Sequence, residues 1–216
     1  MSAPLYNHVV EIGAGDRASS EALDEGIWKQ AGRITLYEPN KILYADLVKA
    51  EDLILRRDHT AYKGYVDPFP FRRAVQVINA AVASATWGQL DFYHMGYASW
   101  ASGAPSFVAT SVEPEGLAYL APLVRKVSAL EAAKVVGPDV DLLILTCNGC
   151  ERVCLESMDR NPHWPAEIRT KHYMHNAAQV AEAQAVWLLL GGRGYRGTAV
   201  ERNQHGTFCH IHWRQS

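Results

Sequence analysis

The chain has 216 residues, with 21 lysines and arginines against 23 aspartates and glutamates, so its formal net charge is −2. This balance excludes the strong basic excess that is typical of proteins that bind nucleic acid or anionic membranes. With 48% hydrophobic and 20% charged residues, the composition also excludes a disordered or fibrous chain. The length predicts one domain over residues 1–216.

The sequence shows no feature of a membrane or secreted protein. No apolar run approaches the roughly 20 residues that cross a bilayer, and the N-terminal residues do not follow the pattern of a signal peptide. Three of the four cysteines, Cys147, Cys150 and Cys154, lie in one short segment, which does not suit a framework of disulfides. We therefore expect a cytoplasmic protein with reduced thiols that binds neither membrane nor nucleic acid.

The first quarter of the chain has the pattern of a parallel sheet wrapped by helices. An apolar run at 8–12 predicts a buried strand, and apolar residues at every fourth position predict a helix over 20–31. A second strand at 34–38 is stopped by Pro39, and helical spacing resumes over 43–54. This order of strand, helix, strand and helix predicts an α/β fold.

The later apolar runs predict six more strands and a long helix: strands at 74–82, 89–95, 140–146, 166–170, 195–200 and 207–213, and the helix at 176–190. The run at 89–95 is expected in an inserted hairpin, and the most apolar run, 140–146, at the centre of the sheet. The last two runs predict an antiparallel pair. The predicted fold is a doubly wound, mostly parallel, Rossmann-like sheet with an inserted hairpin and a reversed terminal strand.

Four residues at the predicted strand ends indicate a nucleotide-like cofactor. Gly13 and Gly15 follow the first strand, where the backbone of such folds approaches a ligand closely. Glu38 ends the second strand, where a carboxylate can accept hydrogen bonds from the two hydroxyls of an adenosine ribose. Asn79 lies near the end of the third strand, where the adenine would lie.

Two cofactors suit this pattern. Gly13-x-Gly15-x-x-Ala18 matches the dinucleotide fingerprint, which leaves a nicotinamide dinucleotide as one alternative. Glu11, two residues before Gly13, would not favour a pyrophosphate, but it would favour the cationic sulfonium and ammonium groups of S-adenosylmethionine. We therefore predict S-adenosylmethionine as the cofactor, with Glu11 in the binding set. The structural alternative is that the glycines serve packing alone.

Four segments resemble the FkbM-type methyltransferases, a branch of the class I S-adenosylmethionine-dependent fold: VVEIGAG at 9–15, LYEPNKILYADL at 36–47, INAAVASATWGQLDFYHM at 78–95 and KVSALEAAKVVGPDVDLLILTCNGCERVCLESM at 126–158. The Glu38-Pro39-Asn40 sequence is similar to the family's acidic-Pro-Asn signature, which is more specific than the first motif, VVEIGAG. The resemblance implies transfer of a methyl group from S-adenosylmethionine to an oxygen of a small molecule or a sugar.

The chain also departs from that family. Thr146 and Asn148 stand where the family pattern has carboxylates, and Ile144 stands where it often has a lysine. These losses suggest an alternative, a catalytically inactive methyltransferase-like subunit that binds a protein partner or a second copy of itself.

His172 is the predicted general base. It follows the strand predicted at 166–170, at the edge where parallel sheets place their chemistry, and an imidazole there could take the proton from an acceptor hydroxyl. The alternative is a loop histidine that is hydrogen-bonded to backbone. No metal site is predicted, because the clustered cysteines follow a buried strand, where cysteine acts as a small hydrophobe.

Overall fold

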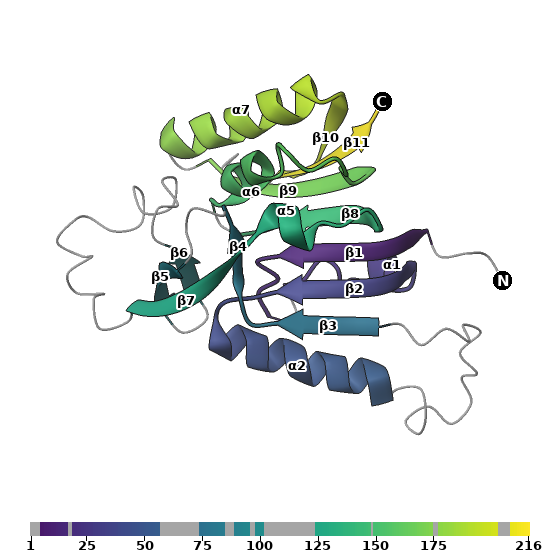
Figure 1. Ribbon diagram of the computed structural model, residues 1–216, viewed down its shortest axis with the longest axis vertical. Helices are drawn as coiled ribbons and strands as arrows, with labels where there is room; N and C mark the ends of the chain where they lie inside the picture. The colour runs from purple at the N-terminus through teal and green to yellow at the C-terminus, as the bar shows by residue number, and fades with distance from the viewer. Residues whose placement is uncertain are drawn as a thin grey trace.

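The computed structural model describes residues 5–16, 19–56, 74–84, 89–95, 98–101, 124–147, 149–174, 177–202 and 208–216. Its centre is a seven-stranded sheet in the order β10-β11-β9-β8-β1-β2-β3 (Figure 1). The strands are β1 (Tyr6–Ile12), β2 (Ala31–Tyr37), β3 (Ala74–Ile78), β8 (Val140–Leu145), β9 (Glu167–Tyr173), β10 (Tyr195–Arg202) and β11 (Phe208–Gln215). Within this sheet β11 runs opposite to the other six strands, and it pairs antiparallel with both β10 and β9. The reversed terminal strand and the central place of β8 are confirmed.

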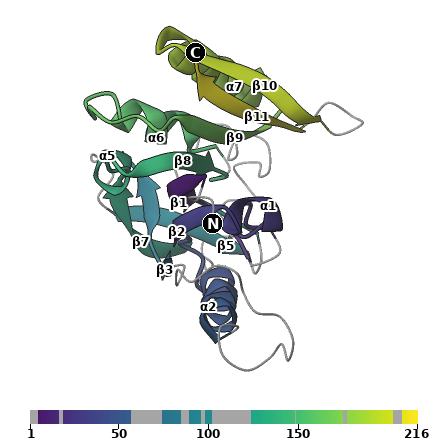
Figure 2. The same ribbon diagram turned by 90° about the vertical axis from the view of Figure 1, so that its right-hand side faces the viewer.

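Helices cover both faces of the sheet, as a doubly wound fold requires (Figure 2). One core lies under α5 (Ala132–Val135), α6 (Glu151–Ser157) and α7 (Ala177–Gly192), and the other lies under α1 (Glu25–Trp28) and α2 (Lys41–Arg56). The strands between the two cores are buried on both faces, which explains the apolar run of β8. Among the helices that the structure describes, none has the length and apolarity to span a membrane.

A second, four-stranded sheet contains the inserted hairpin. Its order is β4-β7-β5-β6, with β4 (Ala81–Ala83), β5 (Gln89–Met95), β6 (Ala98–Ala101) and β7 (Val124–Glu131). β5 and β6 pair antiparallel, as predicted. The single strand predicted at 74–82 is wrong, because β3 and β4 belong to different sheets. The Asn79 side chain ends β3 by donating to the carbonyls of Glu38 (2.8 Å) and Pro39 (3.2 Å).

The helix predicted at 20–31 is also largely wrong. Only Glu25–Trp28 is helical, and β2 already begins at Ala31. The preceding residues do not continue the helix because backbone N–H groups of Glu21 and Ala22 donate to the Glu11 side chain. The helix starts only after Asp24, whose carboxylate accepts from the Gly26 N–H and caps it.

The two terminal strands are anchored by a buried tryptophan. Trp213 on β11 is 1% exposed, and its indole N–H donates to Thr170 Oγ1 at 2.9 Å. Its ring packs edge-on against Trp187 of α7, with centroids 4.8 Å apart. On β10, Gly197 lies against the same ring, where a Cβ would come within 2.6 Å of it. The absence of a side chain at Gly197 therefore lets Trp213 fill the space under α7.

We predict that Gly197→Ala lowers the free energy of unfolding by about 2 kcal/mol, because the fully packed Trp213 ring must shift. Gly192→Ala is the control, since a Cβ at Gly192 has no neighbour within 4 Å and the residue is helical. That control should leave stability unchanged or raise it by up to about 1 kcal/mol. Urea unfolding followed by circular dichroism measures both. Equal stability of the two variants would contradict this packing.

Candidate functional site

The candidate site lies at the carboxyl edge of the central strands. β1 ends beside β2 on one side and β8 on the other, with Ile12 paired to Tyr37 and to Leu145. The turn that follows β1 contains Gly13 at φ 80° and Gly15 at φ 70°, in the left-handed region that favours glycine. A Cβ at Gly13 would lie 2.7 Å from the Cα of Cys147. Close packing against the end of β8 therefore accounts for this glycine.

Glu38 connects the glycine turn to the end of β2. Its carboxylate accepts from the Gly15 N–H at 2.8 Å and from the Asn40 N–H at 2.7 Å. The residue is 4% exposed, and burial raises the pKa of the carboxyl to about 7, although the two backbone hydrogen bonds act in the opposite direction. The site thus holds a buried acceptor whose hydrogen-bond partners among the described residues are backbone N–H groups and not a cation.

The two asparagines of the site serve the backbone around Glu38. Asn40 caps α2, because its side-chain oxygen accepts from the Ile42 N–H at 3.0 Å. Asn79, predicted beside an adenine, is exposed at the end of β3 and close to Glu38. The structure therefore brings Gly13, Gly15, Glu38 and Asn79 together at one edge of the sheet.

Glu11 lies apart from the opening of this site. It is 0% exposed, and its carboxylate accepts from Ser20 Oγ at 2.5 Å, the Glu21 N–H at 3.0 Å and the Ala22 N–H at 3.1 Å. All of these donors belong to the segment that follows the glycine turn. Glu11 thus positions that segment, and its placement does not favour the predicted contact with a ligand.

The surroundings of Glu11 contain no compensating cation from β8. The residue paired with it there is Ile144, at the position where the resemblance places a lysine. Ile144 is itself fully buried. Burial raises the pKa of Glu11 to about 7, and the hydrogen bonds from Ser20, Ala22 and Glu21 offset only part of this rise. Three donors therefore take the place of a counter-ion.

A series of ion pairs connects the segment that Glu11 holds, residues 20–22, to β9 and β11. Arg169 on β9 binds Glu21 at 2.7 Å and Glu167 at 2.8 Å, and Arg214 on β11 binds Glu167 at 3.1 Å. The Arg169 side chain is 14% exposed, so these contacts are only weakly screened by water. Sequence reasoning missed Ser20 and Arg169. Glu167 and Arg169 are two residues apart and so share one face of the strand, and this spacing could have indicated the ion pair of Arg169.

Backbone donors of the glycine turn are already used within the protein. The N–H groups of Gly13 and Ala14 both donate to the Tyr37 carbonyl, at 2.9 and 3.2 Å. The Gly15 N–H donates to Glu38, and the Asp16 N–H donates to Ser19 Oγ at 2.9 Å. A pyrophosphate needs such N–H groups, together with the N-terminus of a helix that follows directly. The observed turn therefore does not favour a dinucleotide.

The departures from the family pattern have structural roles. Thr146, at the position of a family carboxylate, donates its hydroxyl to the Gly13 carbonyl at 2.8 Å and so ties the end of β8 to the turn. Ile144 fills the core beside Glu11. Asn148 lies outside the described residues.

The structure places His172 within β9, with only 5% of its surface exposed. The Thr170 hydroxyl, which accepts from Trp213, lies 2.8 Å from His172 Nε2 and can donate its own proton there. Burial, with a smaller contribution from His210, lowers the pKa of His172 to about 4. Its lone pair is occupied and its basicity is low, so these contacts fit a structural imidazole better than a general base.

Of the clustered cysteines, Cys150 and Cys154 are buried and Cys147 is partly buried, and all three are free thiols. Hydrogen bonding to Cys147 and burial raise the pKa of Cys150 well above its ordinary value. Cys154 donates to the Val82 carbonyl at 3.3 Å. Within the described part of the chain, no group of three or more histidine, cysteine or acidic side chains is placed to hold a metal ion.

We predict that Glu11→Ala lowers the free energy of unfolding by about 3 kcal/mol, because it leaves three buried donors without an acceptor. Glu156→Ala removes an exposed carboxylate that pairs with Arg152 one helical turn away, and it should cost at most about 0.5 kcal/mol. Urea unfolding at neutral pH compares the two. A similar cost for both variants would show that Glu11 does not brace the segment.

The low pKa of His172 predicts the sign of a pH effect on stability. Between the ordinary value of 6.5 and about 4, the unfolded chain binds a proton that the folded chain does not. His172 should therefore lower the free energy of unfolding by about 3 kcal/mol as the pH falls through this window, whereas Glu11 and Glu38, with pKa values raised to about 7, contribute in the opposite direction, so the test is the difference in slope between the parent and a His172 variant. His172→Gln should remove that part of the slope, whereas His163→Gln, at an exposed histidine, should not. An unchanged slope in His172→Gln would refute the assignment.

Comparison with known proteins supports the fold and leaves the family unassigned. No protein-family model and no curated protein matches the sequence significantly. Among solved structures, the chain is similar to the methyltransferase FkbM from Methylobacillus flagellatus KT, with 12% identity and a TM-score of 0.57. The alignment covers 97% of this chain but 43% of that one, so the chain spans less than half of the FkbM protein.

Two further structures are similar over most of their own length. One is a candidate rRNA methylase from Clostridium thermocellum, with 9% identity, a TM-score of 0.50 and coverage of 98% of this chain and 89% of that one. The other is precorrin-6y C5,15-methyltransferase from Geobacter metallireducens GS-15, with 15% identity, a TM-score of 0.47 and coverage of 99% and 83%. The sheet order, its reversed strand and the two similarities with TM-scores of 0.50 or more, to the FkbM protein and the rRNA methylase, show that the chain has the class I methyltransferase fold.

Proposed function

We propose that the chain binds S-adenosylmethionine at the carboxyl edge of β1 and β2 and transfers its methyl group to an oxygen of a small molecule or a sugar. When bound, this cofactor supplies an electrophilic methyl group on a sulfonium. The observation that carries the proposal is Glu38, a buried carboxylate at the end of β2 that lies against the glycine turn.

The donor and acceptor groups of the site fit an adenosyl ligand. A ribose diol offers two O–H donors, and the carboxylate of Glu38 can accept both. Gly13 and Gly15 keep side-chain bulk out of the adjoining turn, and Asn79 lies beside Glu38. The turn leaves few N–H groups for phosphates, which favours a cofactor without them. Glu11 acts through the segment 20–22 and does not take part in binding.

The protein would contribute to catalysis mostly by positioning the acceptor against the methyl group. Methyl transfer depends on an acceptor held in line with the reactive methyl group, and on removal of its proton at the right moment. The contacts of His172 do not support it as the base, so the proposal rests on orientation by the carboxyl edge. The oxygen acceptor follows from the resemblance to FkbM-type enzymes.

A second function, that of an inactive binding or assembly subunit, is favoured by two observations. Thr146 uses its hydroxyl to hold the glycine turn, and His172 is buried and neutral. Such a subunit could retain cofactor binding and lack turnover. Transfer of a tritiated methyl group to protein-free metabolite extract separates the two functions, because only an enzyme transfers label.

Binding of S-adenosylhomocysteine tests the proposal. We predict saturable binding by isothermal titration calorimetry, and about tenfold weaker binding to Glu38→Gln, because the amide replaces one acceptor oxygen with a donor. Glu156→Gln, an exposed acid on α6, should bind as the parent does. Absence of binding at millimolar ligand, or equal binding by the parent and Glu38→Gln, would contradict the proposal.

The raised pKa of Glu38 predicts that the affinity for S-adenosylhomocysteine depends on pH. With a pKa of about 7 in the free protein, the carboxylate that accepts the ribose hydroxyls is depleted below neutrality. Affinity should therefore fall about tenfold between about pH 8 and about pH 6 in the parent. Glu38→Gln cannot titrate and should show no such fall. A residue that serves structure alone would not link affinity to pH in this way.

A further inference from the structure

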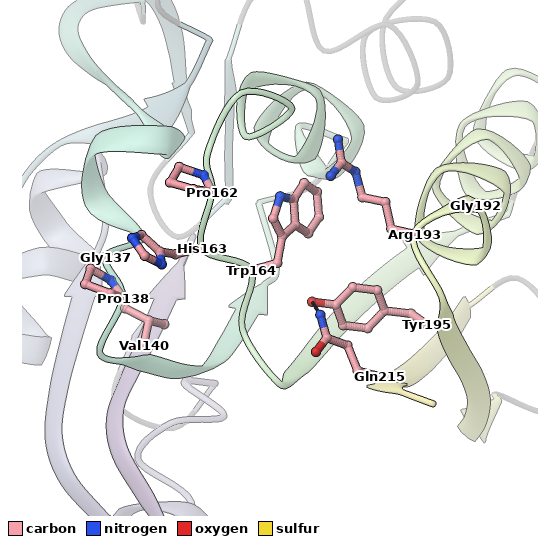
Figure 3. A pocket seen from close by; sticks show the side chains of 10 residues that line it. All are labelled: Gly137, Pro138, Val140, Pro162, His163, Trp164, Gly192, Arg193, Tyr195 and Gln215. Atoms are coloured by element: carbon pink, nitrogen blue, oxygen red, sulfur yellow. Dashed lines mark hydrogen bonds between the residues drawn. The ribbon is translucent and has the colours of Figure 1, made fainter.

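A separate cavity opens at the opposite edge of the sheet. It has a volume of about 630 Å³, within the range of small-molecule sites, and it is formed where strands begin rather than where they end. Its walls are the turn before β8, the connection from α6 to β9, the turn from α7 into β10, and the last residue of β11 (Figure 3). The glycine turn and Glu38 lie at the carboxyl edge, so this cavity is distinct from the proposed cofactor site.

Aromatic rings form much of the cavity wall. Trp164 and Tyr195 are neighbours with centroids 6.3 Å apart, and the ring of His163 lies farther along the wall, beside Gly137 and Pro138 (Figure 3). Tyr195 is held in place by its hydroxyl, which donates to the Pro165 carbonyl and receives a hydrogen bond from Gln215 at 3.3 Å. Such a rigid wall of rings suits a flat ligand with an apolar body.

The cavity also favours negative charge. The guanidinium of Arg193 lies over the Trp164 ring, 4.1 Å from its centroid, and no carboxylate side chain is among the described residues that line the cavity. Both hydrogen bonds that the Arg193 side chain makes to described residues use Nη2 and go to Asp159. Nε and Nη1 are left as donors for a ligand.

One donor at the wall lacks an acceptor. Among the described residues, the indole N–H of Trp164 has no hydrogen-bond partner, although the atom is buried. Figure 3 shows the nitrogen side of the ring toward the wall of Pro162 and His163. A small rotation of the ring would present this N–H to an acceptor oxygen of a ligand. Such a pairing would remove the cost of a buried unsatisfied donor.

We propose that this cavity binds a small aromatic carboxylate, with its ring against Trp164 and Tyr195 and its carboxylate on Arg193. This site is independent of the proposed function, because none of its residues belongs to the carboxyl edge. The geometry assigns Arg193 the recognition of charge and Trp164 the recognition of the ring.

Fluorine NMR with 4-fluorobenzoate and its neutral analogue 4-fluorobenzamide tests the proposal on the full chain. We expect saturable binding of the benzoate and about tenfold weaker binding of the benzamide, since only the former gains a charge-assisted hydrogen bond. Arg193→Gln should weaken benzoate binding about tenfold and change benzamide binding little. Arg160→Gln, at an exposed arginine outside the cavity, should bind as the parent does.

Two more variants keep the test decisive. Asp159→Asn removes the negative charge that pairs with Arg193 but keeps the guanidinium, so benzoate should bind as tightly as to the parent or more tightly. Glu38→Gln should leave benzoate binding unchanged, because it lies at the other edge. Absence of binding at millimolar benzoate, equal binding of benzoate and benzamide, or loss of benzoate binding in Glu38→Gln would each overturn the proposal.

Discussion

The buried carboxylate of Glu11 is the constraint on which the candidate site depends. It lies one residue before the end of the central strand β1, with no cation on the neighbouring β8, and it is stabilised by three donors from residues 20–22. These hydrogen bonds fix the path of the chain after the glycine turn and prevent a helix from starting there. Glu21 then meets Arg169, which connects the same segment to β9. The Glu11 carboxylate thus connects β1, through residues 20–22, to β9.

Glu11 fixes the path of residues 20–22, and this path also determines which kind of ligand can bind at the carboxyl edge. Because the described residues 19–24 are not helical, and because the turn's N–H groups are bonded to Tyr37, Glu38 and Ser19, a pyrophosphate would meet few donors. Glu38 remains as a buried acceptor beside the turn. An adenosyl group offers hydroxyl donors to that acceptor and carries no phosphate. The donors and acceptors of the edge and the class I methyltransferase fold therefore both favour S-adenosylmethionine.

Sequence reasoning predicted the sheet well because strands buried on both faces leave a strong apolar signal. The central place of β8 and the reversed β11 followed from composition and order alone. The helix at 20–31 failed because the spacing of Leu23, Ile27 and Ala31 carries no information about a carboxylate nine residues upstream. Glu11 and His172 were predicted near the carboxyl edge of the sheet, and both lie near the ends of their strands. Periodicity could not show that the Glu11 side chain accepts from the 20–22 segment or that the His172 ring contacts Thr170.

The most direct test of the central claim is an NMR titration that follows the backbone amides of Gly15 and Asn40, both of which donate to Glu38. The account predicts that S-adenosylhomocysteine shifts both resonances saturably, because the ribose hydroxyls compete for the same carboxylate, while NAD⁺ at equal concentration leaves them in place. Shifts caused by NAD⁺, with none from S-adenosylhomocysteine, would contradict it and identify the turn as a dinucleotide site.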